Sequence, residues 1–249
     1  MVFPGMNPII AIPSRLSATR LPNKPLADIH GVPMIVQVWR RAVEADCGPV
    51  LVACAEQALV DAVTRAGGMA VLTDPSHPTG SDRIAEAIGR ADPGRKHDVV
   101  INVQGDLPTV DPAVIRASLL ALEDPGVDIG TLVAEIKHEE ERTNPNVVKC
   151  VTGFAPGKRV ARALYFSRAT VPARQGPHYH HIGLYAYRRA ALERFVKLPS
   201  GVLQQRESLE QLRALENGMR IDAVLVDTVP LGVDTPADLA RARELLAPR

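Results

Sequence analysis

The chain has 249 residues, of which 46% are hydrophobic and 23% charged, and its formal net charge is +1. This length and mixture are typical of a globular protein with a substantial core, and near-neutral charge with only 4% aromatic residues argues against a nucleic-acid-binding surface. Three scattered cysteines, Cys47, Cys54 and Cys150, exclude a disulfide framework and argue against a Cys-based zinc site.

The first residues lack the charged start and the long apolar segment of a secretory signal. Nowhere does an uninterrupted apolar run approach the ~20 residues that cross a bilayer. We therefore expect a cytoplasmic protein without a membrane partner.

The first half of the chain alternates apolar runs with helical patterns. Strands are expected at 8–12, 49–55, 69–73, 98–106 and 127–136, and helices at 31–46, 56–68, 81–91 and 111–124. We expect 98–106 to be the longest buried strand, Pro33 to lie in the first turn of its helix, and Ser81 to be an N-cap. This alternation favours an α/β fold, a mostly parallel Rossmann-like sheet with helices on both faces.

The middle of the chain changes character. Residues 146–167 look like two strands joined by a Gly/Pro turn, followed by a loop at 168–181 and a strand at 182–188. Helices at 189–197, 207–219 and 235–247 and a strand at 220–227 complete the pattern, with Thr235 and Asp238 forming a capping box. We expect one domain over 1–249 with a small antiparallel β-rich insertion at about 137–190.

The loop after the first strand holds Arg15, Arg20 and Lys24 with no acidic residue between them. Ligands of open parallel sheets bind beyond the carboxyl ends of the strands, so these cations are placed to clamp phosphate oxygens. Backbone N–H groups of residues 14–19 would add an anion nest. A solvated basic loop explains the same charges equally well.

Two aspartates follow other expected strands. Asp106 stands at the carboxyl end of the strand expected at 98–106, in the run Gln104-Gly105-Asp106, and Asp234 precedes the last helix. Each alone is most simply a turn or cap residue. Together they would suit Mg²⁺, which often takes one or two carboxylates plus substrate phosphates.

Three further polar segments remain ambiguous from the residues alone. Residues 77–83 suit anion or nucleotide contact at a helix start, or a plain capped helix. The histidines at 178, 180 and 181 share no helical i, i+4 face, which favours one histidine reaching a substrate over a zinc site. The pair Glu210-Gln211 is either a polar wall or a solvated helix face.

Taken in order, the segments resemble one family. They are IPSRLSATRLPNKPLADIHGVPMI, NVQGDLP, NPNVVKCV, ALYFSRATVP, HHIGLYAYR, ESLEQLR and GVDTPADL. The chain is similar to the 3-deoxy-manno-octulosonate (Kdo) cytidylyltransferases from about Pro8 to Leu246, which implies a single nucleotidyltransferase domain.

The resemblance implies a reaction of CTP with the sugar acid Kdo. The anomeric 2-hydroxyl of Kdo attacks the α-phosphorus of CTP, releasing pyrophosphate and forming CMP-Kdo for lipopolysaccharide synthesis. Positioning and charge neutralisation would supply the catalysis. Two other readings stay open: a relative acting on sialic acid or amino-Kdo, and a nucleotide-binding regulator that has lost the chemistry.

The resemblance also implies residue roles. Arg15, Lys24 and Asp106 would be catalytic, with Asp106 and Asp234 as ligands of Mg²⁺. The nucleotide would be bound by Arg15, Arg20, Lys24, Ser81, Arg83 and Gln104. The Kdo pocket, in the β-rich subregion and the segments that follow it, would be lined by Arg168, His181, Tyr185, Glu210 and Gln211.

The sequence departs from the family pattern in places. Leu107 stands where an acidic residue is expected after the QGD run, and Ser81-Asp82 replaces a Thr-Glu pair. The loop between Pro172 and His178 is short. The family also implies a homodimer in which the β-rich subregion reaches the partner.

Overall fold

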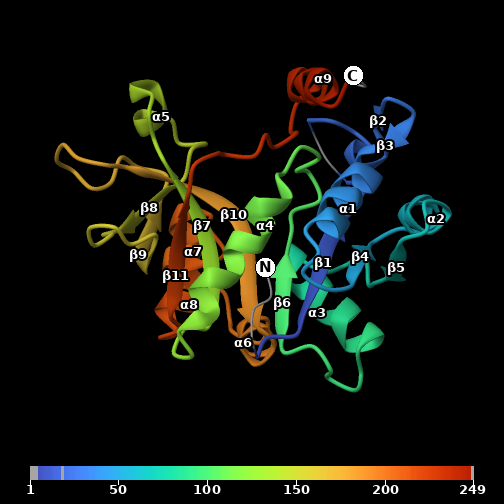
Figure 1. Ribbon diagram of the computed structural model, residues 1–249, viewed down its shortest axis with the longest axis horizontal. Coiled ribbons are helices and arrows are strands. Elements are labelled where there is room, and N and C mark those ends of the chain that lie inside the picture. The colour runs from blue at the N-terminus through green and yellow to red at the C-terminus, as the bar shows by residue number, and fades with distance from the viewer. Residues whose placement is uncertain (1–4, 18–19, 248–249) are drawn as a thin grey trace. The chain divides into compact units, whose positions relative to one another are not determined.

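The structure is a computed structural model that describes residues 5–17 and 20–247. The chain divides into two compact units (Figure 1). The first unit combines Met1–Arg116 with Pro230–Arg249, and the second is Ala117–Val229. The second unit therefore contains the β-rich subregion expected at 137–190 and extends beyond it on both sides.

The first unit is built on a parallel sheet with the strand order β5-β4-β1-β6. These strands are β1 (Pro8–Ser14), β4 (Val50–Cys54), β5 (Met69–Leu72) and β6 (Val99–Asn102). Nearly every residue of β1, β4 and β6 is buried, as expected for parallel strands covered on both faces. The predicted α/β class is confirmed.

Strand order and chain direction place the helices of this unit. The chain steps outward from β1 through α1 (Met34–Glu44) to β4 and through α2 (Gln57–Arg65) to β5. It then returns through α3 (Gly80–Ala91) to β6 on the other side of β1. Because such crossovers are right-handed, α3 covers the face opposite to α1 and α2. The order reverses at β1, so its carboxyl end is where a ligand crevice is expected.

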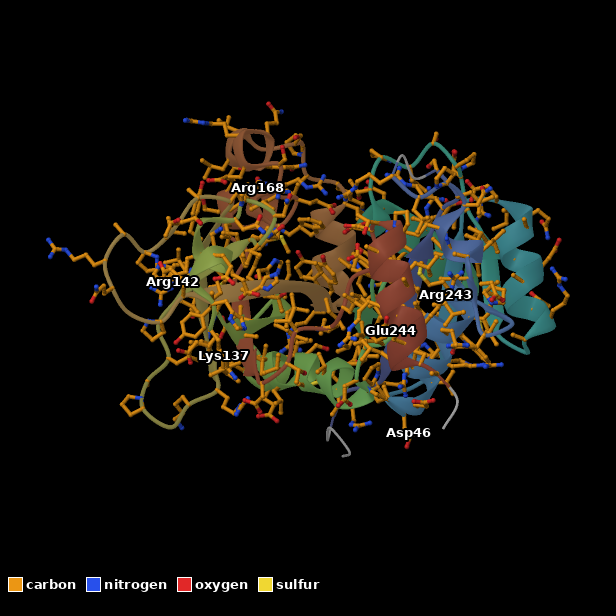
Figure 2. The ribbon with its side chains drawn as sticks, turned by 90° about the horizontal axis from the view of Figure 1, so that it is seen from above. Asp46, Lys137, Arg142, Arg168, Arg243 and Glu244 are labelled. Carbon is orange, nitrogen blue, oxygen red and sulfur yellow. The ribbon has the colours of Figure 1, made fainter. Side chains whose placement is uncertain are left out.

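The last helix, α9 (Pro236–Leu245), returns to the first unit beside a small hairpin of β2 (Asp28–Ile29) and β3 (Val32–Pro33) (Figure 1). Ile29, Met34, Val233, Leu239 and Ala242 form one buried cluster there. The Arg243 side chain, on the same helix in Figure 2, donates from Nε to the carbonyl of Asp28 at 2.9 Å. Packing and hydrogen bonds thus fix the C-terminal segment to residues near the start of the chain.

The second unit holds a mixed sheet centred on β7 (Ile129–Glu135). The other strands are β8 (Lys149–Thr152), β9 (Val160–Ser167), β10 (Tyr179–Arg188) and β11 (Ile221–Val226). Strand β7 is parallel to β11 and antiparallel to β10, and β9 is antiparallel to both β11 and β8. The antiparallel pair expected within 146–167 is therefore confirmed as β8 and β9.

Short helices connect these strands. The chain enters the unit through α4 (Pro112–Ala117) and the 3₁₀ helix η2 (Ser118–Glu123), which divide the single helix expected at 111–124. The remaining helices are α5 (Glu139–Thr143), α6 (Arg189–Phe195), α7 (Val202–Glu207) and α8 (Leu212–Glu216). Helix α7 was not predicted, and α8 is shorter than the helix expected at 207–219.

Two predicted helix starts are wrong. The N-cap of α3 is Thr79, whose side chain accepts from the backbone N–H of Asp82, so Ser81 lies inside the first turn and is buried. Pro33 precedes α1 in an extended conformation instead of lying in its first turn. The start of α3 shifts because Thr79 can cap a helix as well as Ser81 can.

Two predicted strand limits are also wrong. Strand β6 has four residues, because the chain turns at Gly105 and Asp106, so it is not the longest strand. The longest is β10, with ten residues, among the strands of residues 5–17 and 20–247. It begins at Tyr179 and so includes His180 and His181, which were expected in the preceding loop. No helix within the described ranges is long and apolar enough to cross a membrane.

Candidate active site

Two aspartates of the first unit meet at one lysine. Lys24, in the short 3₁₀ helix η1 (Lys24–Leu26), donates from Nζ to Asp106 Oδ2 and to Asp234 Oδ1, each at 3.0 Å. Only 14% of the Lys24 side chain is exposed, against 35% for Asp106 and 50% for Asp234. Burial lowers the pKa of Lys24, but the two carboxylates outweigh it and the net pKa is raised. The ammonium is therefore held charged between two acids.

Backbone contacts bring these acids together. A Cβ on Gly105 would lie 2.6 Å from the carbonyl oxygen of Pro13, so only glycine lets the turn after β6 pass this close to β1. The N–H of Val233 donates to the carbonyl of Asp106 at 2.9 Å. That bond fixes the segment before α9 beside the turn that holds Asp106.

The segment that carries Asp234 is further fixed by the capping box at the start of α9. Thr235 accepts from the N–H of Asp238, and the Asp238 carboxylate accepts from the N–H groups of Thr235 and Asp234 at 2.8 and 3.1 Å. The predicted capping box is confirmed. It orients the Asp234 backbone so that its carboxylate faces the QGD turn.

The donor set fits a hard divalent cation. Both carboxylates contact the same Nζ atom, so the two oxygens are close enough to share one cation. Mg²⁺ requires oxygen ligands and commonly takes two carboxylates plus phosphate oxygens. No group of three or more His, Cys, Asp or Glu residues able to hold a metal is found in the described part of the chain. A metal here would thus complete its coordination with water and with oxygens that the substrate brings.

The other loop cations lie close by. Arg20 donates from its Nη2 atom to Asp234 Oδ2 at 3.1 Å and is largely exposed. Arg15 is exposed at the carboxyl end of β1. The predicted anion nest over 14–19 lies partly outside the described residues, since Ala18 and Thr19 are not among them. Among its described N–H groups, that of Leu16 already donates to Glu56 Oε2 at 3.0 Å.

Arg83, on α3, is buried to 2% exposure. Its Nη1 atom donates to Thr73 Oγ1 at 2.7 Å and to the carbonyl of Asp74 at 3.0 Å. Burial lowers its pKa, the charge of Glu56 opposes that shift, and the nearby charge of Arg15 adds to it. Its Nη2 atom has no hydrogen-bond partner in residues 5–17 and 20–247. The buried guanidinium of Arg83 therefore adds positive charge near Arg15, and its Nη2 atom can still donate a hydrogen bond.

Two other predicted nucleotide contacts lie near this end of the sheet. Gln104, between β6 and Asp106, donates from Nε2 to Asn102 Oδ1 at 3.3 Å and is partly exposed. Ser81 is buried at 3% exposure in the first turn of α3. Both nucleotide roles stay predictions.

Three of the predicted sugar-pocket residues meet within the second unit. His181 Nε2 lies 3.0 Å from Thr131 Oγ1, and Gln211 Nε2 lies 3.5 Å from His181 Nδ1. The carbonyls of Leu184 and Ile182 lie 3.0 and 3.3 Å from Thr131 Oγ1 and can only accept, which favours a ring that donates from Nε2 to Thr131 and accepts from Gln211 at Nδ1. Burial lowers the pKa of His181 to about 3. The ring of Tyr185 packs against this neutral imidazole at a centroid distance of 5.6 Å.

Glu210 lies near the same group. Its charge, after burial and Tyr187, helps to raise the pKa of Tyr185 well above its ordinary value. Glu210 itself accepts from Nη2 of Arg213 at 2.9 Å. Four predicted residues, His181, Tyr185, Glu210 and Gln211, thus lie near one another in one polar cluster, which we name the polar wall.

Arg168 is held by main-chain acceptors. Its guanidinium, labelled in Figure 2, donates to the carbonyls of Pro145, Glu207 and Ser208 at 3.0, 2.9 and 3.4 Å. These contacts use three of the five N–H donors of the side chain and leave two for a ligand. The role of Arg168 at the sugar carboxylate stays a prediction.

Sequence reasoning missed two residues beside Arg168. Lys149 is fully buried and donates from Nζ to the carbonyls of Asn144, Val147 and Arg168. Glu207 accepts from Ser167 Oγ at 2.8 Å and from the N–H of Arg168 at 3.0 Å. A lysine inside the apolar run VVKCV was the available signal, since buried lysines require partners. Glu207 carried no such signal.

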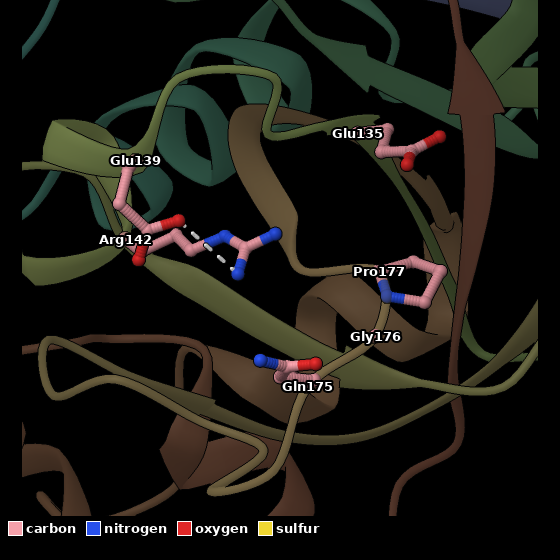
Figure 3. A pocket seen from close by; sticks show the side chains of 6 residues that line it. All are labelled: Glu135, Glu139, Arg142, Gln175, Gly176 and Pro177. Atoms are coloured by element: carbon pink, nitrogen blue, oxygen red, sulfur yellow. Dashed lines mark ion pairs between the residues drawn. The ribbon is translucent and has the colours of Figure 1, made fainter.

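A pocket of about 530 Å³ lies elsewhere in the second unit (Figure 3). Its lining consists of Glu135, Glu139, Arg142, Gln175, Gly176 and Pro177. Arg142 and Glu139 form an ion pair across 3.3 Å. None of the residues predicted for nucleotide, sugar or metal lines this pocket, so it does not mark the site that the sequence indicated.

Comparison with known proteins gives the class of enzyme. A family model described as cytidylyltransferase matches residues 9–221. A solved structure, CMP:2-keto-3-deoxy-manno-octonic acid synthetase complexed with CTP, superposes with a TM-score of 0.88 at 37% identity and covers 97% of this chain and 98% of that one. The parallel sheet and the cationic loop are thus those of a nucleotidyltransferase of the cytidylyltransferase class.

Curated relatives narrow the class. The 3-deoxy-manno-octulosonate cytidylyltransferase of Paramagnetospirillum magneticum is 70% identical over 97% of this chain and 98% of its own length. That of Rhodospirillum rubrum is 67% identical over 96% of this chain and 95% of its own. The chain belongs to the 3-deoxy-manno-octulosonate cytidylyltransferase family.

Proposed function

We propose that this protein transfers CMP from CTP to the anomeric 2-hydroxyl of Kdo, releasing pyrophosphate and forming CMP-Kdo for lipopolysaccharide synthesis. The observation that carries the proposal is the meeting of Asp106, Asp234 and Lys24 at one point of the first unit. Acids and cations in contact at the ends of parallel strands are suited to a metal-bound triphosphate.

Attack at phosphorus needs no covalent enzyme intermediate, so the chain contributes positioning and charge. The side chains of Arg15, Arg20 and Lys24 would contact the phosphates that are released as pyrophosphate. The buried guanidinium of Arg83 would add positive charge near this loop. Asp106 and Asp234 would hold Mg²⁺, which when bound neutralises phosphate charge. Gln104 and Ser81 would face the nucleoside.

The polar wall of the second unit is proposed to bind the sugar acid. His181 is neutral and both of its nitrogens are taken by Thr131 and Gln211, so it would orient Gln211 and present an uncharged ring to the sugar. Glu210, Gln211 and Tyr185 offer acceptors and donors suited to sugar hydroxyls. Arg168 would use its two remaining donors on the carboxylate.

We also propose a homodimer and a cytoplasmic location. Leu164 on β9 is 63% exposed within the β-rich subregion, where the family resemblance implies the contact with the partner. Cys54 and Cys150 are free thiols, in keeping with a reducing compartment. Sedimentation of wild type and Leu164→Asp tests the dimer: a wild-type monomer, or an unchanged dimer in the variant, removes this assignment.

The central experiment incubates the protein with CTP, Mg²⁺ and one sugar acid at a time and follows pyrophosphate release. Kdo, amino-Kdo and sialic acid are the acids compared, and UTP and ATP replace CTP in parallel. We expect release with CTP and Kdo. Release with another acid alone would reassign the sugar, and no release with any pair would reject the enzyme activity.

A further inference from the structure

The position of Lys24 is the starting point. Its ammonium bridges Asp106 and Asp234 at 3.0 Å to each, and its side chain is mostly buried. Two carboxylates this close repel each other unless a cation lies between them. In this structure the protein supplies that cation itself.

The same two carboxylates are those proposed to hold the divalent cation. An ammonium and a divalent cation cannot both bind the same pair of oxygens closely, because like charges at such separation repel strongly. Binding of one cation therefore weakens binding of the other. Arg20 is different, since it contacts only Asp234, through the other oxygen Oδ2, and is largely exposed.

We propose that Lys24 is a built-in competitor of the divalent cation. It occupies both carboxylates in the nucleotide-free protein and transfers to the triphosphate when metal and nucleotide bind. This inference rests on the proposed function. Its consequence is that the metal binds weakly alone and tightly with CTP, because the nucleotide offers the displaced ammonium another anion. Such coupling is reciprocal: metal must strengthen CTP binding by the same factor.

The test measures Mn²⁺ binding without nucleotide, by electron paramagnetic resonance of the free ion. Wild type is compared with Lys24→Met and Lys24→Gln, which remove the ammonium in two different ways. We expect both variants to bind Mn²⁺ at least about tenfold more tightly than wild type, since a competing charge is lost. Circular dichroism checks that each variant is folded. If one of the two Lys24 substitutions prevents folding, the other still tests the proposal.

Two controls separate competition from a general change in charge. Arg20→Gln removes the same charge from a cation that pairs with one carboxylate only, and we expect a clearly smaller gain. Lys24→Met combined with Asp106→Asn must lose the gain, since one of the shared oxygens is altered. Equal affinity in wild type and both Lys24 variants, or an equal gain in Arg20→Gln, overturns the proposal.

The outcome is independent of catalysis. Pyrophosphate release by wild type with CTP and Kdo tests the proposed function separately. Active wild type without a gain in Lys24→Met rejects the competitor role alone. Inactive wild type with the gain rejects the proposed function and leaves the competition in place.

Discussion

Glu207 holds Arg168 twice: its Oε2 accepts the backbone N–H of Arg168 at 3.0 Å, and its carbonyl accepts the Nε–H at 2.9 Å. The carboxylate also accepts from Ser167 Oγ at 2.8 Å. One side chain thus ties the end of β9 to the end of α7. The residues that follow α7 include Glu210 and Gln211, so this tie positions part of the polar wall.

The first prediction concerns this tie. Glu207→Ala leaves the Ser167 hydroxyl and the Arg168 N–H without their acceptor, and we expect a loss of about 3 kcal/mol in unfolding free energy. Glu207→Gln keeps one oxygen and should recover roughly half of that loss. Urea unfolding midpoints measure both.

Kinetics show whether the same tie serves the sugar. The KM for Kdo should rise more than the KM for CTP in Glu207→Ala, with Glu207→Gln intermediate. Equal changes in both KM values would reduce Glu207 to a structural role.

The second prediction removes one proposed metal ligand. Asp106→Asn keeps the shape of the side chain but loses its charge, and turnover should fall at least about 100-fold, because several kcal/mol of charge neutralisation are lost. Asp227→Asn is the matched control, since Asp227 is exposed and paired with Arg159 in the second unit. Turnover of Asp106→Asn within a factor of about two of that control would remove Asp106 from the site.

The third prediction tests the close approach at the QGD turn. Gly105→Ala forces a Cβ to 2.6 Å from the Pro13 carbonyl, so the backbone must shift. We expect a loss of about 1–3 kcal/mol in unfolding free energy and, because Asp106 is the next residue, a marked fall in turnover. Gly89→Ala lies within α3 with open space around its Cβ and should be neutral or more stable by about 0.5–1 kcal/mol.

The fourth prediction concerns pH. The folded-state pKa of His181 is about 3 against an ordinary value of 6.5, so between these values the unfolded chain takes up a proton that the folded protein does not. Above pH 6.5 the titration of His181 therefore does not change the free energy of unfolding. Below pH 6.5 it lowers that free energy progressively, by about 2 kcal/mol at pH 5.

Unfolding curves from pH 7 to pH 4.5 check this sign. His181→Asn should lose stability less steeply than wild type as the pH falls, whatever its stability at pH 7. The exposed His138→Asn variant serves as the control for the loss of a histidine side chain. Parallel slopes for His181→Asn and wild type would contradict the buried neutral state.

Features that depend on residues close together in the sequence were predicted better than features that depend on distant residues. The cap of α9 was predicted because Thr235 and Asp238 interact within one helical turn, with Pro236 at the first helical position. The start of α3 was misassigned because Thr79 and Ser81 are both good caps and only the backbone path selects one. The end of β6 was misplaced because Gly105 turns where Pro13 passes, and nothing local records that contact.

The candidate active site was likewise predicted in its residue types but not in its tertiary contacts. Residue type and strand ends indicated Asp106, Asp234 and Lys24, and the structure brings them into contact. That Asp234 and Lys24, 210 positions apart, meet at one atom depends on the tertiary bond between Val233 and Asp106. Lys149 and Glu207 escaped notice because their partners are main-chain groups and hydroxyls, which every sequence contains.

The first unit is discontinuous, and this has a consequence for biosynthesis. Asp234 and α9 belong to the first unit but are translated after the whole of the second. A nascent chain that has already formed β1, β4, β5 and β6 still lacks one of its two carboxylates and the helix that covers the β2–β3 hairpin. The partner acid of Lys24 thus emerges from the ribosome only after the whole second unit, so Lys24 and Asp106 meet Asp234 late in synthesis.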